Sequence, residues 1–220
     1  MNRFLASFLA SGFLLTFDCP SLAHDRSKKT GVLMPGIKVL VYDYVQVPWP
    51  TLGRTEREVA RIFHDAGIEV TWRSCNTGMT GIHQEADCTH EVRPADLLLR
   101  IVSEIATIPG FTPDTTMGFA IGNLASVSFS RVREEAVRFE VSPSEVLIPA
   151  IAHEIGHMLG QRGHSPTGIM RARWERRDYI ALPRGVFKFT AEQAEQMRAE
   201  VSTRNRMQQA DALPGTAARK

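Results

Sequence analysis

Three histidines and one glutamate lie close together in the segment "AHEIGHMLGQRGHSPTGIM", Ala152 to Met170. His153 and His157 are four residues apart, so on a helix their imidazoles project from one face and can bind one metal ion. Neutral imidazole suits zinc, and a catalytic zinc site has three protein ligands and one position left for water. Glu154 is placed to take a proton from that water. The spacing therefore predicts a hydrolytic zinc site with Glu154 as the general base.

The third ligand has to come from another position, and His164 is the first candidate. Gly160 is suited to end the helix in a left-handed conformation, which lets the chain double back and bring His164 to the metal. The alternative is a carboxylate from a downstream helix, with Glu175 or Glu192 in reach by sequence. No motif around these two glutamates selects either of them.

A helix of this kind could instead belong to a non-catalytic, zinc-stabilised module that binds a partner. Such a module needs the zinc ligands, but it does not need a general base. The presence of Glu154 between the two histidines therefore favours the enzyme.

Hydrophobic periodicity predicts the elements that must position this segment. Apolar residues alternate or run continuously in some stretches and recur at helical spacing in others. The predicted strands are 37–47, 68–75, 95–105, 117–123 and 125–136, and the predicted helices are 51–67, 142–159 and 190–201. The stretch 95–105 is continuous and apolar, which favours a central strand. Gly122 and Asn123 predict a turn between the last two strands.

Helix ends give further expectations. Thr55 is a candidate cap for the first helix, and Ser142 with Glu145 predicts a capping box at the start of the histidine helix. Pro149 removes a backbone donor, so it is expected to kink that helix or delay its regular part to Ala150.

The segment also resembles a known family. "HEIGHMLGQRGH" followed by "SPTGIM" resembles the metzincin zinc proteases, and His164-Ser165 followed closely by Gly-Ile-Met is most similar to the matrixin branch. The resemblance implies an α+β fold: a mixed five-stranded sheet with an active-site helix, a Met-turn and a C-terminal helix. It also implies a role for each matching residue: His153, His157 and His164 as zinc ligands, Glu154 as the base and Met170 as the Met-turn residue.

Two more expectations follow from the resemblance. The strand at 117–123 would be the edge strand that pairs with an extended peptide substrate. The third ligand of the family stands one residue earlier, where this chain has Gly163. A one-residue insertion between Gly160 and Gly163 is easy for a glycine-flanked loop to absorb.

The first residues are typical of an export signal. A short basic start precedes an apolar run and the small residues "SLA", which predicts a signal peptide at 1–23. A membrane anchor is the alternative, but the run is shorter than the roughly 20 residues that span a bilayer. We expect a polar arm at 24–36, a zinc metalloprotease domain at 37–204 and a disordered tail at 205–220. The mature chain would be secreted or periplasmic, without stable membrane insertion.

The cysteines agree with export. Signal removal would leave Cys75 and Cys88, an even pair, which predicts a disulfide in an oxidising compartment. The alternative is that both cysteines bind zinc with His83 or His90, although no C-x-x-C pair is present.

The charge balance limits the partners. A formal net charge of +2 is too small to indicate nucleic acid or a membrane surface, so we expect a protein or peptide substrate. The local cluster "RARWERR", 171–177, is either a solvated surface turn or a contact for acidic substrates.

Overall fold

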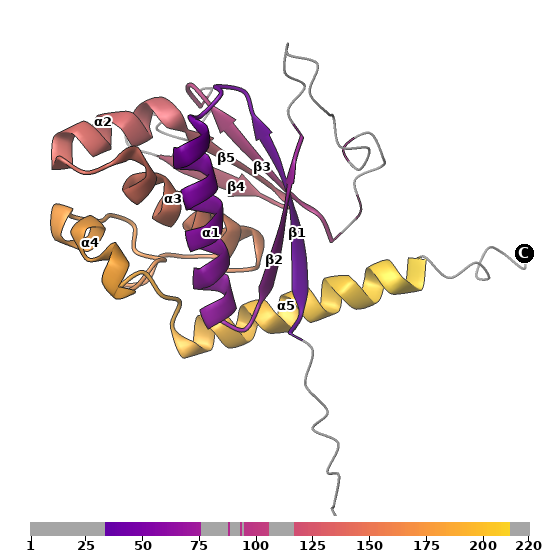
Figure 1. Cartoon of the computed structure of the whole chain (residues 1–220). Helices are drawn as coiled ribbons and strands as arrows, with labels where there is room; N and C mark the ends of the chain where they lie inside the picture. Colours follow the sequence, from indigo (N-terminus) through magenta and orange to yellow (C-terminus); the bar gives the residue numbers. More distant parts are fainter. Residues whose placement is uncertain (1–33, 76–87, 89–92, 94, 106–116, 212–220) are drawn as a thin grey trace, which may run out of the picture. The chain divides into compact units, whose positions relative to one another are not determined.

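A mixed five-stranded sheet forms the centre of the structure (Figure 1). The computed structural model describes residues 34–75, 88, 93, 95–105 and 117–211, which belong to one compact unit. The strands are β1 (Gly36–Asp43), β2 (Glu69–Ser74), β3 (Leu97–Val102), β4 (Gly118–Ile121) and β5 (Leu124–Ser128). Their order is β2-β1-β3-β5-β4, and every neighbouring pair is parallel except β4 with β5. This confirms the predicted α+β class and the central position of the strand at 95–105.

Helices bury the apolar side chains that alternate along the strands. In β1, Ile37, Val39 and Val41 are almost fully buried, as the period of two predicts. Helices α1 (Trp49–Asp65) and α3 (Pro143–Met158) pack against each other and contribute to the same core. Helix α3 also contacts β4 and β5, so the histidine segment lies against the edge of the sheet.

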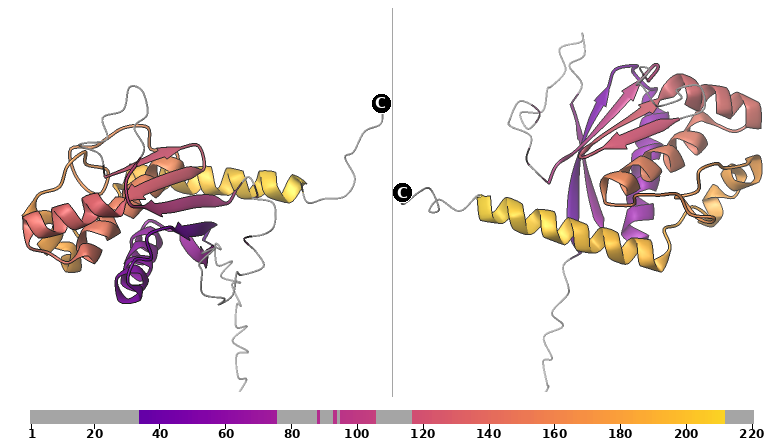
Figure 2. Two further views of the ribbon diagram at one scale, coloured as in Figure 1. Left: turned by 90° about the horizontal axis from the view of Figure 1, so that it is seen from above. Right: turned by 180° about the vertical axis from the view of Figure 1, so that it is seen from behind.

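Helix α5 (Ala191–Asp211) crosses the end of the sheet where β1 begins, as both views from the side show (Figures 1 and 2). Asn205 Nδ2 donates to the Gly36 carbonyl over 3.0 Å, and Arg204 donates to the Met158 carbonyl and to Asn123 Oδ1. The predicted disordered tail is therefore wrong for 205–211, because these residues continue the helix. Residues 212–220 lie outside the described residues.

The stretch predicted as a strand at 125–136 is corrected by the structure. Strand β5 ends at Ser128, and helix α2 (Phe129–Phe139) follows at once. The Ser128 hydroxyl accepts a hydrogen bond from the Arg131 amide and so caps the helix. Val132 and Ala136, one turn apart, are the residues that α2 buries. The apolar residues thus change from a period of two in the strand to helical spacing in α2.

One predicted helix start is also wrong. Helix α1 begins at Trp49 after Pro48, and Thr55 lies within it, where its hydroxyl donates to the Thr51 carbonyl. A proline in the first turn suits the helix start, since the first amides have no intrahelical partner.

Helix α3 begins at Pro143, as the predicted range 142–159 requires, and runs through Pro149, so the expected delay of its regular part to Ala150 is wrong. The predicted capping box is present, because Glu145 accepts a hydrogen bond from the Ser142 amide over 2.8 Å. Nearly every residue of α3 is buried. Burial on this scale outweighs the hydrogen bond that the proline removes.

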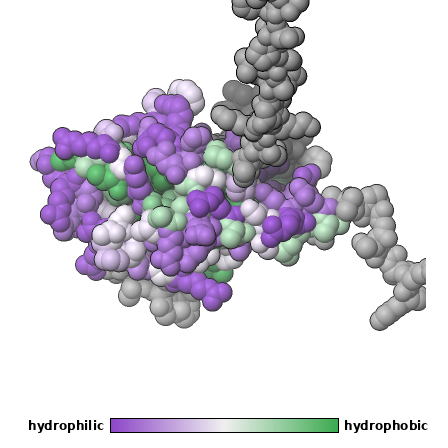
Figure 3. Space-filling view, turned by 90° about the horizontal axis from the view of Figure 1, so that it is seen from below, coloured by the Kyte–Doolittle hydropathy of each residue, from purple (hydrophilic) through white to green (hydrophobic). Residues whose placement is uncertain are grey.

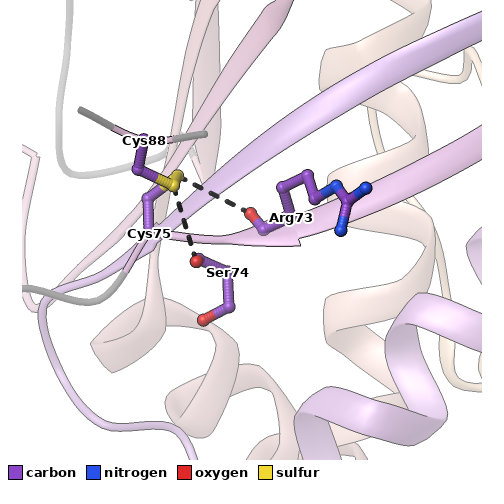
Figure 4. The surroundings of a disulfide bond; sticks show 4 residues. All are labelled: Arg73, Ser74, Cys75 and Cys88. Atoms are coloured by element: carbon purple, nitrogen blue, oxygen red, sulfur yellow. Dashed lines mark hydrogen bonds between the residues drawn. A yellow bond between two sulfur atoms is a disulfide. The ribbon is translucent and has the colours of Figure 1, made fainter. Parts of the chain in front are cut away.

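The predicted disulfide is present between Cys75 and Cys88 (Figure 4). Cys75 follows β2, and its amide donates to the Val41 carbonyl of β1 over 2.7 Å. The bond therefore ties the chain to the edge of the sheet at the end of β2. Zinc ligation by these two cysteines is excluded, and His83, His90 and the predicted signal peptide lie outside the described residues.

No helix among the described residues is long and apolar enough to cross a membrane. Seen from below, hydrophilic residues cover most of the surface that the described residues form, and apolar residues gather mainly in one strip (Figure 3).

Candidate metal centre

Three imidazoles meet at one point beside the sheet. His153 and His157 project from α3 one turn apart, and their Nε2 atoms are 3.0 Å from each other. The His164 ring lies 5.1 Å from the His153 ring and 5.4 Å from the His157 ring, between centroids. One ring nitrogen of each histidine lies within 4.8 Å of the other two. In the part of the chain that the structure describes, no other group of His, Cys, Asp or Glu has this spacing.

Backbone carbonyls hold both helix histidines. Nδ1 of His153 lies 2.9 Å from the Ile169 carbonyl oxygen, and Nδ1 of His157 contacts the Gln161 carbonyl oxygen. A carbonyl only accepts, so in each neutral ring Nδ1 carries the hydrogen and Nε2 keeps a lone pair. Two lone pairs that face each other cannot form a hydrogen bond, whereas a cation between them satisfies both. Tetrahedral zinc would separate two such nitrogens by about 3.3 Å, so the pair fits zinc.

Burial keeps the helix histidines in the form that binds metal. Desolvation lowers the pKa of His153 to about 4, although the bond to Ile169 opposes the shift. Desolvation also lowers the pKa of His157. Both rings are therefore neutral at pH 7, and neutral imidazole is the species that coordinates zinc.

The loop after α3 brings His164 back to the helix. Gly160 has φ +93°, where glycine is favoured, and the chain reverses there as predicted. Gln161 is buried, and its amide donates to the Gly156 carbonyl over 3.1 Å. Arg162 and Gly163 are exposed, and a Cβ built on Gly163 would meet no atom within 4 Å. The additional residue in this loop therefore lies where the chain meets solvent.

Neither of the two alternative carboxylates lies at the point where the three imidazoles meet. Glu175 stands at the start of helix α4 (Arg176–Ile180), and its Oε2 is 3.1 Å from Arg177 Nε. Glu192 is exposed in the first turn of α5. Neither belongs to the group of side chains that could hold one ion.

Met170 lies beneath the helix. It is fully buried, and a Cβ built on Gly156 would lie 2.7 Å from its Sδ. The Met170 carbonyl accepts a hydrogen bond from the Ser165 amide over 2.7 Å, which closes the turn. The neighbouring Ile169 supplies the carbonyl that holds His153. The turn thus supports the helix and orients one ring of the triad.

Glu154 is buried beside the triad. It is 6% exposed, and its Oε2 has no hydrogen-bond partner in the described part of the chain. Desolvation raises the pKa of its carboxyl to about 8. A Cβ built on Gly118 of β4 would lie 2.7 Å from Glu154 Oε1, so the bare backbone of β4 covers this carboxyl. A carboxyl with a pKa near neutrality is suited to take up and release a proton.

Several residues that shape the centre were not predicted. Trp174 packs edge-on against His153, with 5.5 Å between ring centroids, and Gly118 covers Glu154. The carbonyls of Gln161 and Ile169 orient the ligand rings. A backbone carbonyl is common to every residue type, so no sequence pattern marks it. Gly118, Gln161 and Trp174 line a cleft of about 1140 Å³ that runs past the three histidines.

The fold is shared with solved structures of zinc peptidases. No family model matches the chain, and no curated protein matches its sequence. Archaemetzincin from Methanopyrus kandleri matches with a TM-score of 0.50 and 18% identity, over 76% of this chain and 97% of that one. A zinc-dependent peptidase from Methanocorpusculum labreanum matches with a TM-score of 0.51 and 17% identity, over 72% and 99%. Metalloproteinase-II from Bacteroides fragilis matches with a TM-score of 0.50 and 13% identity, over 78% and 55%. At these identities the likeness establishes a common fold, on which all three of these metallopeptidases are built.

Proposed function

We propose that this protein is an exported, zinc-dependent endopeptidase of the metzincin type, most similar to the matrixin branch. The observation that carries the proposal is the triad: His153, His157 and His164 present ring nitrogens to one point, and two of the rings are fixed by backbone carbonyls. About one zinc ion per chain is expected, because the described residues contain a single group of this kind.

Each residue of the centre has a proposed role in hydrolysis. Zinc, when bound, supplies Lewis acidity: it polarises the scissile carbonyl and lowers the pKa of water to about 7. Glu154 takes the proton from the attacking water and delivers it to the leaving amine. Its unpartnered, buried Oε2 supports this role, because no other hydrogen bond among the described residues competes for this oxygen. Extended substrate would pair with the edge of β4, which bonds to β5 on its other side.

Export and the domain limits belong to the same proposal. Residues 1–23 would be removed as a signal peptide, and a polar arm at 24–36 would precede the peptidase domain. The disulfide between Cys75 and Cys88 supports an oxidising compartment, secreted or periplasmic.

Gly118→Ala is expected to lower the rate of peptide cleavage at least about tenfold, the cost of displacing one catalytic group by more than 1 kcal/mol. The new Cβ would lie 2.7–2.9 Å from three atoms of Glu154, so this side chain has to move. Zinc content should stay near one per chain, because no ligand is touched. Gly36→Ala is the matched control, since its Cβ would meet only atoms at 3.7 Å or beyond. Equal rates for the two variants would contradict the role given to β4.

Cleavage of a peptide library by the purified mature chain tests the proposal. Internal bonds should be cut, a chelator should stop the reaction, and added zinc should restore it. A zinc-loaded chain that cuts no peptide in the library would refute the enzyme and leave a zinc-stabilised binding module.

A further inference from the structure

Charged side chains surround the three histidines along the cleft. Five arginines and four glutamates line it: Arg131, Arg138, Arg162, Arg171, Arg173, Glu134, Glu135, Glu154 and Glu175. Most of them form ion pairs within the described residues. The pairs and their N···O distances are Arg131–Glu134 (2.8 Å), Arg138–Glu135 (3.6 Å), Arg171–Asp178 (2.8 Å) and Arg177–Glu175 (3.1 Å). These pairs largely cancel one another's charge.

Two arginines of the cleft do not belong to these ion pairs: Arg162 and Arg173. Both are exposed, and neither has an ion-pair or hydrogen-bond partner among the residues that the structure describes. Arg162 precedes His164 in the loop after α3, and Arg173 precedes Trp174, whose ring contacts His153. The two arginines thus belong to the segments that carry the third histidine and follow the turn beneath α3.

The neighbouring wall presents hydrogen-bond donors. Trp174 Nε1 is buried and has no acceptor within the described part of the chain. An indole N–H and a guanidinium can only donate. Glu135, on α2, also lines the cleft and keeps Oε2 without a hydrogen-bond partner among the described residues, but its Oε1 faces Arg138 at 3.6 Å. The two arginines and the Trp174 N–H are therefore donors without partners in the ranges that the structure describes, and they favour an acceptor that carries negative charge.

We infer that Arg162 and Arg173 select substrates that carry a carboxylate close to the scissile bond. This inference rests on the proposed peptidase function and names the substrate class of that site. A guanidinium binds a carboxylate through two parallel N–H···O bonds, which a neutral amide cannot match. The carboxylate comes either from an Asp or Glu side chain or from the C-terminus of a short peptide. Of the "RARWERR" cluster, Arg173 is the member that acts on substrate, while Arg171 and Arg177 hold acidic neighbours.

Matched peptides separate the two sources of carboxylate. Three internally quenched peptides share the sequence around a bond cut in the library. One has Glu beside the bond and an amidated C-terminus, the second has Gln there and the same amide, and the third has Gln and a free carboxylate close to the bond. The Glu peptide or the free-acid peptide should show kcat/KM about tenfold above the neutral one, and the advantage should shrink at high salt because both arginines are exposed.

Variants assign the preference to the two arginines. Arg162→Gln/Arg173→Gln should lose most of the tenfold advantage, measured as the ratio of kcat/KM between the acidic and the neutral peptide for the same variant. Arg133→Gln/Arg184→Gln is the control, because it removes the same charge from exposed positions that do not line the cleft. Equal cleavage of all three peptides by the unchanged protein, or a preference that survives in the cleft variant, would overturn the inference.

Binding distinguishes this inference from the proposed function. Fluorescence anisotropy of the same three peptides with zinc-loaded Glu154→Gln protein requires no turnover. If the unchanged, zinc-loaded protein cuts no peptide but the acidic peptides bind the Glu154→Gln protein about tenfold more tightly than the neutral one, the enzyme is refuted and carboxylate recognition stands. Equal binding of all three peptides would refute carboxylate recognition.

Discussion

Glu154→Gln is expected to keep zinc and to cleave peptides at least about 100-fold more slowly than the unchanged protein, the lower end for general acid-base catalysis. Glutamine has nearly the same shape, so the helix and the triad should stay in place. The amide, however, cannot take a proton from water at neutral pH. Elemental analysis gives the zinc content, and kcat on one library peptide gives the loss.

Glu134→Gln is the control for this loss. Glu134 lines the same cleft and is paired with Arg131, but it lies on α2 and not on the helix that carries the histidines. Its replacement should change the rate far less. Unchanged turnover in Glu154→Gln would remove the general base from the proposal and favour a binding module.

His164→Ala is expected to weaken zinc binding by about 3 kcal/mol, or roughly 100-fold in affinity. Structural zinc sites bind with about 10–16 kcal/mol, and the variant would lose one of three protein ligands. The His164 ring lies within 5.4 Å of both other rings, between centroids. Because His164 is exposed, its replacement should leave the thermal stability of the metal-free chain nearly unchanged. Competition with a chelating dye measures the affinity.

Glu175→Ala and Glu192→Ala are the paired comparisons. If His164 is the third ligand, both variants should bind zinc with unchanged affinity. Unchanged affinity in His164→Ala, with a loss in either glutamate variant, would instead assign the third ligand to a carboxylate. That result would refute the metzincin assignment and leave a zinc peptidase.

The part of the site that follows from spacing alone lies on one helix. Spacing within α3 determines that His153 and His157 share a face, so no tertiary information is needed. The partners of these rings could not be predicted, because they are backbone carbonyls that the loop after α3 and the turn before Met170 supply. Trp174 and Gly118 are separated from the histidines in sequence, and only the folded chain brings them together.

The errors in the fold have similar causes. The alternation of apolar and polar residues ends at Ser128, so the predicted strand is too long. Val132 and Ala136 already follow helical spacing. Pro149 carries a local cost that would shorten an exposed helix, but α3 is almost entirely buried and keeps its full length. In both helices, the burial of apolar side chains had a larger effect on the secondary structure than the preference of the local sequence.

The bond between Cys75 and Cys88 also removes two sulfurs that could otherwise bind a second metal ion. Thiolates are strong zinc ligands, and oxidation removes both of these sulfurs from competition with the imidazoles. Protein made in a reducing cytosol would present two free thiols at the end of β2, where they offer zinc a second place to bind. A zinc content above one ion per chain in such protein would then indicate that these two cysteines are reduced. The zinc content of the histidine site should therefore be measured on protein in which the disulfide is formed.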